Sequence, residues 1–194
     1  MYCLLCVLCD VDCAQVPLGW EYEMRATYVE VYNENIYDLF SDSDVKTRDA
    51  PLQLRQKQDG SVHLPDAKHR VITGEADVEE LMALAQSKRH VASTSMNARS
   101  SRSHAVFSLF LVGKNDSENV QLSGSLNLVD LAGSERLDRS QAEGARLKET
   151  QAINKSLSCL TDVFTALSRK QSHIPFRNSK LTFLLQKCFS KNGN

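Results

Sequence analysis

The stretch "LVDLAGSE", residues 128–135, decides how the chain is interpreted. An apolar strand that ends in Asp130 and is followed three residues later by Gly133 matches the D-x-x-G pattern of phosphate-sensing loops in nucleoside triphosphatases. In such loops the Asp reaches a magnesium ion through water, and the Gly N–H approaches a terminal phosphate because no side chain blocks it. Alone this pattern is weak, because strand-ending Asp and turn Gly are common.

A second polar segment, "NARSSRSH" at residues 97–104, precedes another expected strand. Its hydroxyl groups suit magnesium and phosphate oxygens, and Arg102 can neutralise charge or pair with a carboxylate. Loops rich in Ser and Asn also commonly cap helix ends, so this segment taken alone leaves both interpretations open.

The remaining pattern predicts alternating strands and helices. We expect, in order, a strand at 21–32, a short helix at 33–40, a hairpin around Asp59-Gly60, a helix with Asp77 as N-cap and Glu80 as its capping-box partner, strands at 104–113 and 120–130, and helices at about 150–167 and 178–188. The apolar run at 126–130 is typical of a buried central strand. Together these elements predict a three-layer α/β domain.

Charge is distributed unevenly over the 194 residues, whose net charge is −1. From residue 163 onward there are six basic and no acidic side chains, whereas the remainder holds 17 basic against 24 acidic ones. A basic end on an acidic body indicates an anionic partner, such as nucleic acid, an acidic protein surface or a membrane, or simply a solvated helix face. No stretch reaches the ~18 apolar residues of a membrane span.

The cysteines allow two interpretations. Cys3, Cys6, Cys9 and Cys13 have the C-x₂-C-x₂-C-x₃-C spacing of ferredoxins, but Ala14 stands where that run has Pro, and no second ligand set follows. The same four positions fall on one face of an α-helix, which favours an apolar stripe. We expect Cys159 and Cys188 to be core residues, in a reducing setting without disulfides.

The pair of segments resembles switch I and switch II of the kinesin motor domain. The stretches "YVEVYNENIYDLF", "ETQAINKSLSCL" and "HIPFRNSKLTFLLQ" also resemble kinesin sequences, in the same order, so the likeness runs from about residue 19 to 186. "QAINKSLSCL" and "GWEYEM" are most similar to C-terminal-motor kinesins. The resemblance implies a three-layer, P-loop-NTPase-like α/β motor domain with a central, mostly β, sheet flanked by helices and truncated at both ends. Residues 1–18 would be a divergent, helical segment and 19–194 the partial motor domain.

The resemblance also implies roles for individual residues. Switch I would span 97–104 and switch II 130–135, and ATP with Mg²⁺ would be the cofactors. Ser101 would ligate Mg²⁺, Asp130 would hold it through water, Asn97 and Ser100 would lie near the γ-phosphate, and the Gly133 N–H would sense that phosphate. Arg102 and Glu135 would form an ion pair that closes around ATP and breaks when phosphate leaves.

The implied partner is tubulin, whose acidic face would meet helices at about 150–188. The residues that match the family's microtubule contacts are Arg136, Asn154, Lys155, His173, Arg177 and Lys180. The acid-free end therefore coincides with the expected filament-binding surface, whose attraction should weaken with salt. The resemblance implies a location in the cytoplasm on the microtubule cytoskeleton, with the spindle as one candidate, and neither nucleic acid nor membrane as partner. No heptad run for a coiled coil is present.

The chain contains no G-x-x-x-x-G-K-[ST] motif, the P-loop that holds the β- and γ-phosphates. Because that loop supplies much of the positioning in phosphoryl transfer, we expect this polypeptide alone to bind ATP poorly and to hydrolyse it negligibly. Three hypotheses follow: a partial head of an ATP-driven microtubule motor, a non-hydrolysing microtubule-binding module, and an iron–sulfur or other metal protein built on the first four cysteines.

Overall fold

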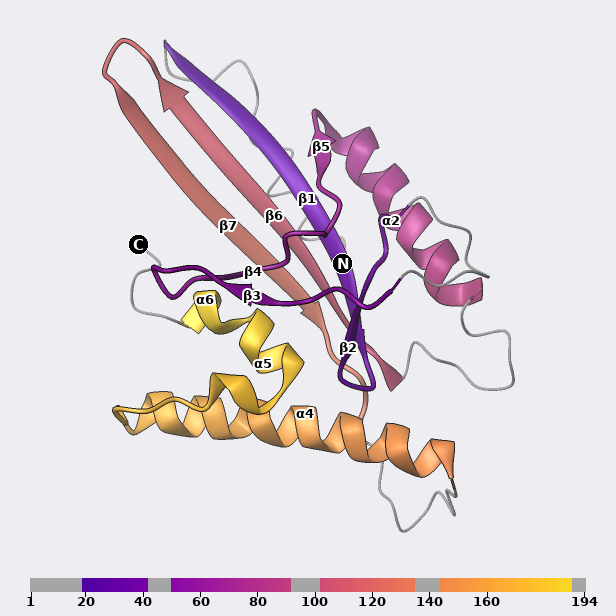
Figure 1. Cartoon of the computed structure of the whole chain (residues 1–194). Coiled ribbons are helices and arrows are strands. Elements are labelled where there is room, and N and C mark those ends of the chain that lie inside the picture. Colours follow the sequence, from indigo (N-terminus) through magenta and orange to yellow (C-terminus); the bar gives the residue numbers. More distant parts are fainter. Residues whose placement is uncertain (1–18, 42–49, 92–101, 135–143, 190–194) are drawn as a thin grey trace.

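The computed structural model describes residues 19–41, 50–91, 102–134 and 144–189 (Figure 1). Its elements are β1 (Trp20–Tyr32), β2 (Asn35–Asp38), β3 (Arg55–Gln56), β4 (Val62–His63), β5 (Arg70–Ile72), α2 (Glu75–Val91), β6 (His104–Asn115), β7 (Val120–Asp130), α4 (Ala145–Ser168), the 3₁₀ helix η3 (Phe176–Asn178), α5 (Lys180–Leu184) and α6 (Gln186–Phe189). The expected strands at 21–32, 104–113 and 120–130 are confirmed, as is the hairpin around Gly60.

One antiparallel sheet organises the molecule, with strand order β2-β1-β6-β7 and β5 paired beside β2 on β1. Helix α2 lies against one face, and α4, α5 and α6 lie on the other side, below the sheet in Figure 1. The three-layer arrangement predicted from the sequence is therefore confirmed.

Alternation along β1 and β6 builds two cores, one on each face of the sheet. On the α2 face, Tyr28 and Phe107 pack edge to face with ring centroids 5.7 Å apart, and the fully buried Phe40 joins them. On the opposite face, Val31 and Val106 pack against residues of α5. Successive strand residues point to opposite faces, so each strand contributes to both cores.

The prediction of a short helix at 33–40 is wrong, because Asn35–Asp38 forms strand β2 and pairs with β1 in a tight hairpin. Asn33 and Glu34 make the turn with φ values of 50° and 58°, the left-handed conformation that two-residue hairpins require. Ile36 and Leu39 had suggested a helical spacing, but four residues are too few to distinguish the two periods.

Helix α2 begins two residues before the expected N-cap. Asp77 lies within its first turn, and its carboxylate accepts hydrogen bonds from the Thr73 N–H and hydroxyl, both 2.6 Å, and from the Gly74 N–H at 3.2 Å. These donors lower the pKa of Asp77 below its ordinary value, chiefly through the Thr73 hydroxyl. Asp77 therefore stabilises the helix start from inside the helix and is not the N-cap.

Three further expectations are corrected on the other side of the molecule. Strand β7 is not a buried central strand, because β6 is its one partner among the described strands and Leu126 and Val129 are exposed. The helix expected at 178–188 is divided into η3, α5 and α6, with the Ser179 hydroxyl capping α5. Cys159 is buried as expected, whereas Cys188 is exposed.

An aromatic stack at the β6–β7 hairpin end of the sheet packs closely against Gly113. Trp20 and Tyr22 stack with ring centroids 5.8 Å apart, and a Cβ on Gly113 would lie 2.7 Å from Tyr22 Cε1 and 3.3 Å from the Trp20 ring. We expect Gly113→Ala to displace this stack and to lower the free energy of unfolding, measured in urea, by about 1 kcal/mol.

Gly124→Ala is the matched control for that substitution. Gly124 also lies within a strand of this sheet, but its added Cβ would meet no atom within 4 Å. Alanine there should be neutral or stabilising by about 0.5–1 kcal/mol, since it restricts the unfolded chain. Equal effects of the two substitutions would contradict the role of the aromatic stack.

Within the described residues, no helix combines the length and apolar character needed to cross a membrane.

Candidate functional site

The described parts of the two polar segments lie at one end of the sheet. Strands β6 and β7 are antiparallel neighbours in which Ala105 pairs with Asp130, so the start of β6 and the end of β7 lie side by side. The sequence-predicted residues Asn97, Ser100, Ser101, Glu135 and Arg136 lie outside the described residues. Arg102, His104, Asp130 and Gly133 are described, and they form the site.

Asp130 ends β7 with a side chain that is 69% exposed and forms an ion pair with Arg89 of α2, at 3.1 Å from Nη1 to Oδ2. Burial raises the pKa of the Tyr28 phenol above its ordinary value, although the positive charge of Arg89 and its hydrogen bond with the phenol oppose this shift. The sequence analysis did not identify Arg89 as a site residue. The one feature that could have indicated it is its position at the end of an expected helix, just before the polar segment 97–104.

Two features at the end of β7 are compatible with a phosphate and a hydrated cation. A Cβ built on Gly133 meets no atom within 4 Å, so the backbone there is open to an approaching group. The exposed Asp130 carboxylate supplies oxygen, the atom that Mg²⁺ prefers, and its exposure leaves room for the water that such a contact needs. These residues fit a water-mediated Mg²⁺ contact, and Ser101 would have to complete it.

Arg102 has a partner that the sequence did not indicate. Its guanidinium Nη1 lies 3.2 Å from Oε2 of Glu149, in the first turns of α4, with 15% and 19% of the two side chains exposed. The hydroxyl of Tyr32, at the end of β1, donates to the other carboxylate oxygen of Glu149. Glu149 thus joins β1, the start of β6 and α4, whereas the pairing of Arg102 with Glu135 stays a prediction.

His104 connects three elements through both ring nitrogens. Nδ1 accepts the Ala132 N–H at 3.1 Å, and Nε2 lies 2.7 Å from the Ser156 hydroxyl of α4. The ring is 3% exposed, and burial lowers the pKa of His104 below its ordinary value despite the opposing charge of Asp130. The imidazole is therefore neutral at pH 7.

Helix α4 presents a buried face to the sheet and a polar face to solvent. Ile153, Ser156 and Cys159 lie on the buried face, and Lys155 on the exposed one. In the segment that packs back on α4, His173 and Arg177 are exposed, and the Arg177 guanidinium hydrogen-bonds Gln56 of β3. Predicted contacts Asn154 and Lys180 are half-buried.

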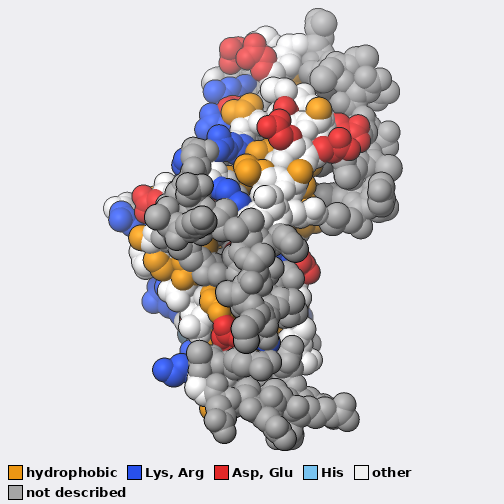
Figure 2. Space-filling view, turned by 90° about the vertical axis from the view of Figure 1, so that its right-hand side faces the viewer, with side chains coloured by type: hydrophobic (Ala, Val, Ile, Leu, Met, Phe, Trp, Pro, Cys, Tyr) orange, Lys and Arg blue, Asp and Glu red, His pale blue; other side chains and the backbone are white. Residues whose placement is uncertain are grey.

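Acidic and basic side chains are both present on the face seen in Figure 2, but in different proportions. Most of its acidic side chains lie in the upper half, and Lys and Arg side chains follow the left edge from the upper half into the lower half, where α4 lies. The acid-free end of the sequence, from residue 163, forms the last turns of α4 together with η3, α5 and α6.

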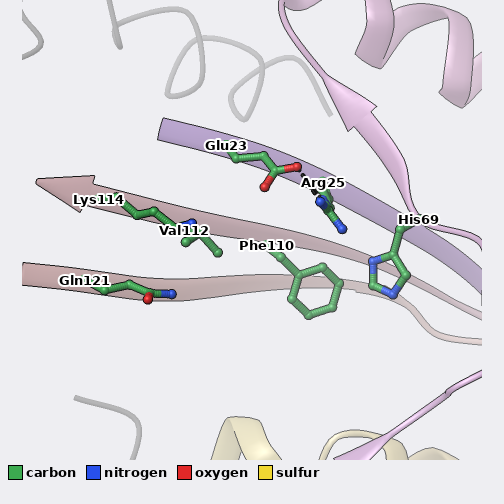
Figure 3. A pocket seen from close by; sticks show the side chains of 7 residues that line it. All are labelled: Glu23, Arg25, His69, Phe110, Val112, Lys114 and Gln121. Carbon is green, nitrogen blue, oxygen red and sulfur yellow. Dashed lines mark hydrogen bonds and ion pairs between the residues drawn. The ribbon is translucent and has the colours of Figure 1, made fainter. Parts of the chain in front are cut away.

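A hollow in the surface lies away from these residues. It is a shallow depression of about 360 Å³ toward the far end of the sheet, lined by Glu23, Arg25, His69, Phe110, Val112, Lys114 and Gln121 (Figure 3). Lys114 pairs with Gln121 at the hairpin end of β6 and β7, opposite to the end that carries Asp130. This hollow therefore does not belong to the site.

No three His, Cys, Asp or Glu side chains gather as a metal cluster within the described ranges. The four N-terminal cysteines lie outside those ranges, so the iron–sulfur hypothesis rests on spacing alone.

Comparison with known proteins decides the family. The family model of the kinesin motor domain matches residues 12–194. The chain belongs to the kinesin motor domain family. It is 46% identical over 178 residues to kinesin-like protein KIN-14N of Oryza sativa subsp. japonica, covering 90% of this chain and 23% of that protein. With kinesin-like protein klpA of Emericella nidulans it shares 50% over 179 residues, covering 91% and 23%.

Solved kinesin structures agree with the fold. A C-terminal motor domain of Kar3 from Candida glabrata is 39% identical with a TM-score of 0.71, covering 95% of this chain and 51% of that one. The KIF14 dimer in complex with a microtubule is 31% identical with a TM-score of 0.81, covering 95% and 54%. The predicted resemblance to C-terminal-motor kinesins is confirmed. This kinesin chain spans about a quarter of the curated relatives that it matches and about half of the solved motor chains.

Proposed function

We propose that this chain is the switch and filament-binding part of a kinesin head, which belongs to an ATP-driven microtubule motor of the C-terminal-motor type. The observation that carries the proposal is that the described parts of the two segments, 102–104 and 130–134, lie at one end of the sheet, and that Arg102 pairs there with Glu149 of α4. Its place of action would be the microtubule cytoskeleton of the cytoplasm.

Each switch residue would have a defined part in nucleotide binding. Asp130 would hold Mg²⁺ through water together with Ser101, and the Gly133 N–H would donate to the γ-phosphate, with Asn97 and Ser100 nearby. When bound, Mg²⁺ would neutralise charge on the phosphates. Arg102 would close on Glu135 around ATP.

The contact between Arg102 and Glu149 supports a link from switch I to the filament-binding helix. Glu149 lies about 1.7 turns before Lys155 on α4. A movement of α4 on the filament would therefore change the position of the Arg102 partner, which is how filament binding would reach the nucleotide loops.

A second candidate function is a microtubule-binding module that does not hydrolyse ATP. The observation that favours it is that basic side chains such as Lys155 and Arg177 are exposed on α4 and the segment after it, an exposure that requires no bound nucleotide. The two functions differ in whether nucleotide changes the affinity for the filament.

Co-sedimentation of the purified chain with microtubules tests both. We expect Lys155→Glu to weaken binding at least about 5-fold, because it reverses a charge on the exposed face of α4, and we expect added salt to weaken binding of the unmodified chain. Lys114→Glu, at the opposite end of the sheet, makes the same charge change and should leave binding unaltered.

The outcomes separate the hypotheses. Binding that changes between ADP and a non-hydrolysable ATP analogue supports the motor function, whereas equal binding with and without nucleotide supports the second function. No pelleting at low salt, or equal loss with Lys155→Glu and Lys114→Glu, would count against the proposed filament-binding surface.

A further inference from the structure

His104 makes two hydrogen bonds that reach in different directions from the start of β6. One goes to the backbone of Ala132, in the loop that follows β7, and the other to the Ser156 side chain on the buried face of α4. These partners lie 28 and 52 residues away in the sequence, and all three residues are buried.

The hydrogen atoms in this chain of contacts have one consistent arrangement. Ala132 offers an N–H, so Nδ1 of His104 must be the nitrogen that carries the lone pair, and the proton of the neutral ring is then on Nε2. The Nε2–H donates to the Ser156 hydroxyl, which in turn donates to the Ile153 carbonyl at 2.7 Å. Both ring nitrogens therefore have a hydrogen-bond partner. In the other tautomer, the Nδ1–H would face the Ala132 N–H and neither could accept a hydrogen bond.

We propose that His104 is a positioning residue that couples α4 to the switch II loop, through simultaneous hydrogen bonds to Ser156 and Ala132. The proposal rests on the proposed function for its consequence, because Ala132 precedes the phosphate-sensing Gly133 and Ser156 follows the filament-facing Lys155.

The coupling follows from how short and how buried the contacts are. A shift of α4 by about 1 Å would stretch or break the contact with Ser156 unless the imidazole moves with it, and a moving ring carries its bond to Ala132. A broken bond would leave a buried N–H without a partner, which costs about 1–3 kcal/mol, so the three groups move together. No apolar side chain of the same size would transmit the movement in this way.

Hydrogen exchange in Ser156→Ala tests the coupling. We expect the Ala132 amide, which the substitution does not touch, to exchange at least about 10-fold faster than in the unmodified chain. Nitrogen-15 spectra of the unmodified chain should show His104 as the Nε2–H tautomer, and in Ser156→Ala this preference should weaken.

Thr161→Ala is the matched control. Thr161 lies on the same helix and its hydroxyl donates to the Leu157 carbonyl, the same type of bond that Ser156 makes, but its side chain is exposed instead of buried. Exchange at Ala132 should be unchanged in this variant. A faster Ala132 amide in both variants, or in neither, or an Nδ1–H tautomer in the unmodified chain, would overturn the proposal.

A second measurement uses the filament. Microtubule binding should change the exchange rate of the Ala132 amide in the unmodified chain and in Thr161→Ala. In Ser156→Ala this change should be at least 5-fold smaller. Failure of the unmodified chain to bind microtubules would contradict the proposed function. The tautomer of His104 and the exchange rate of the Ala132 amide would still test the coupling, because neither measurement needs the filament. Equal responses of all three proteins to the filament would contradict the coupling alone.

Discussion

Leu181→Ala is expected to lower the free energy of unfolding by about 2–5 kcal/mol and to abolish binding to microtubules. Leu181 of α5 is fully buried, with 0% of its surface exposed, and it packs in the cluster with Val29, Val31, Ile36 and Val106 on the face of the sheet away from α2. Truncating it removes buried methyl groups and leaves a cavity between α5 and the strands.

The loss of binding follows from the position of α5. Arg177 and Lys180 lie within four residues of Leu181, and Lys180 is oriented by its backbone N–H, which donates to Glu34 at 3.1 Å. Without the Leu181 anchor, this short helix and η3 would no longer be held beside α4, so the basic side chains would be dispersed.

Urea unfolding and co-sedimentation at one salt concentration measure the two effects. Leu122→Ala is the control, because Leu122 of β7 is 56% exposed and the same truncation should cost less than about 1 kcal/mol without altering binding. A similar cost for the two substitutions, or full binding by folded Leu181→Ala, would show that α5 does not depend on this contact.

The long strands and helices were predicted correctly from the sequence, whereas the short strand β2 and its turn were not. Thirteen residues of β1 and 24 of α4 show their period clearly, so their type was predictable. Strand β2 has four residues, and its hairpin turn uses Asn33 and Glu34 in the left-handed conformation without any glycine. No local rule distinguishes such a turn from the first turn of a helix.

The site was predictable as two motifs but not as a set of contacts. Because the motifs flank two consecutive antiparallel strands, their meeting at one sheet end follows from the order of elements. The partners of Arg102 and His104 on α4 lie 47 and 52 residues away, respectively. Several polar residues of α4 were equally plausible partners before the helix was placed, so Glu149 and Ser156 required the structure.

Glu149→Lys is expected to lower the free energy of unfolding by about 3 kcal/mol or more. The carboxylate of Glu149 accepts from both Arg102 and Tyr32, and the ion pair is largely shielded from water. A lysine there places a second positive charge against the Arg102 guanidinium and removes the acceptor of the Tyr32 hydroxyl. Breaking a shielded pair in this way leaves an uncompensated charge, which is costly.

Glu149→Gln and an exposed ion pair provide the controls, all measured by urea unfolding. Glutamine keeps an acceptor oxygen and adds no charge, so it should cost about 1–2 kcal/mol. Glu23→Lys makes the same reversal in the exposed pair of Glu23 with Arg25, at 2.6 Å, and should cost at most about 1 kcal/mol because water screens it. The double variant Arg102→Glu with Glu149→Lys should recover part of the loss if the two side chains interact directly, and equal costs for Glu149→Lys with and without Arg102→Glu would show that they do not.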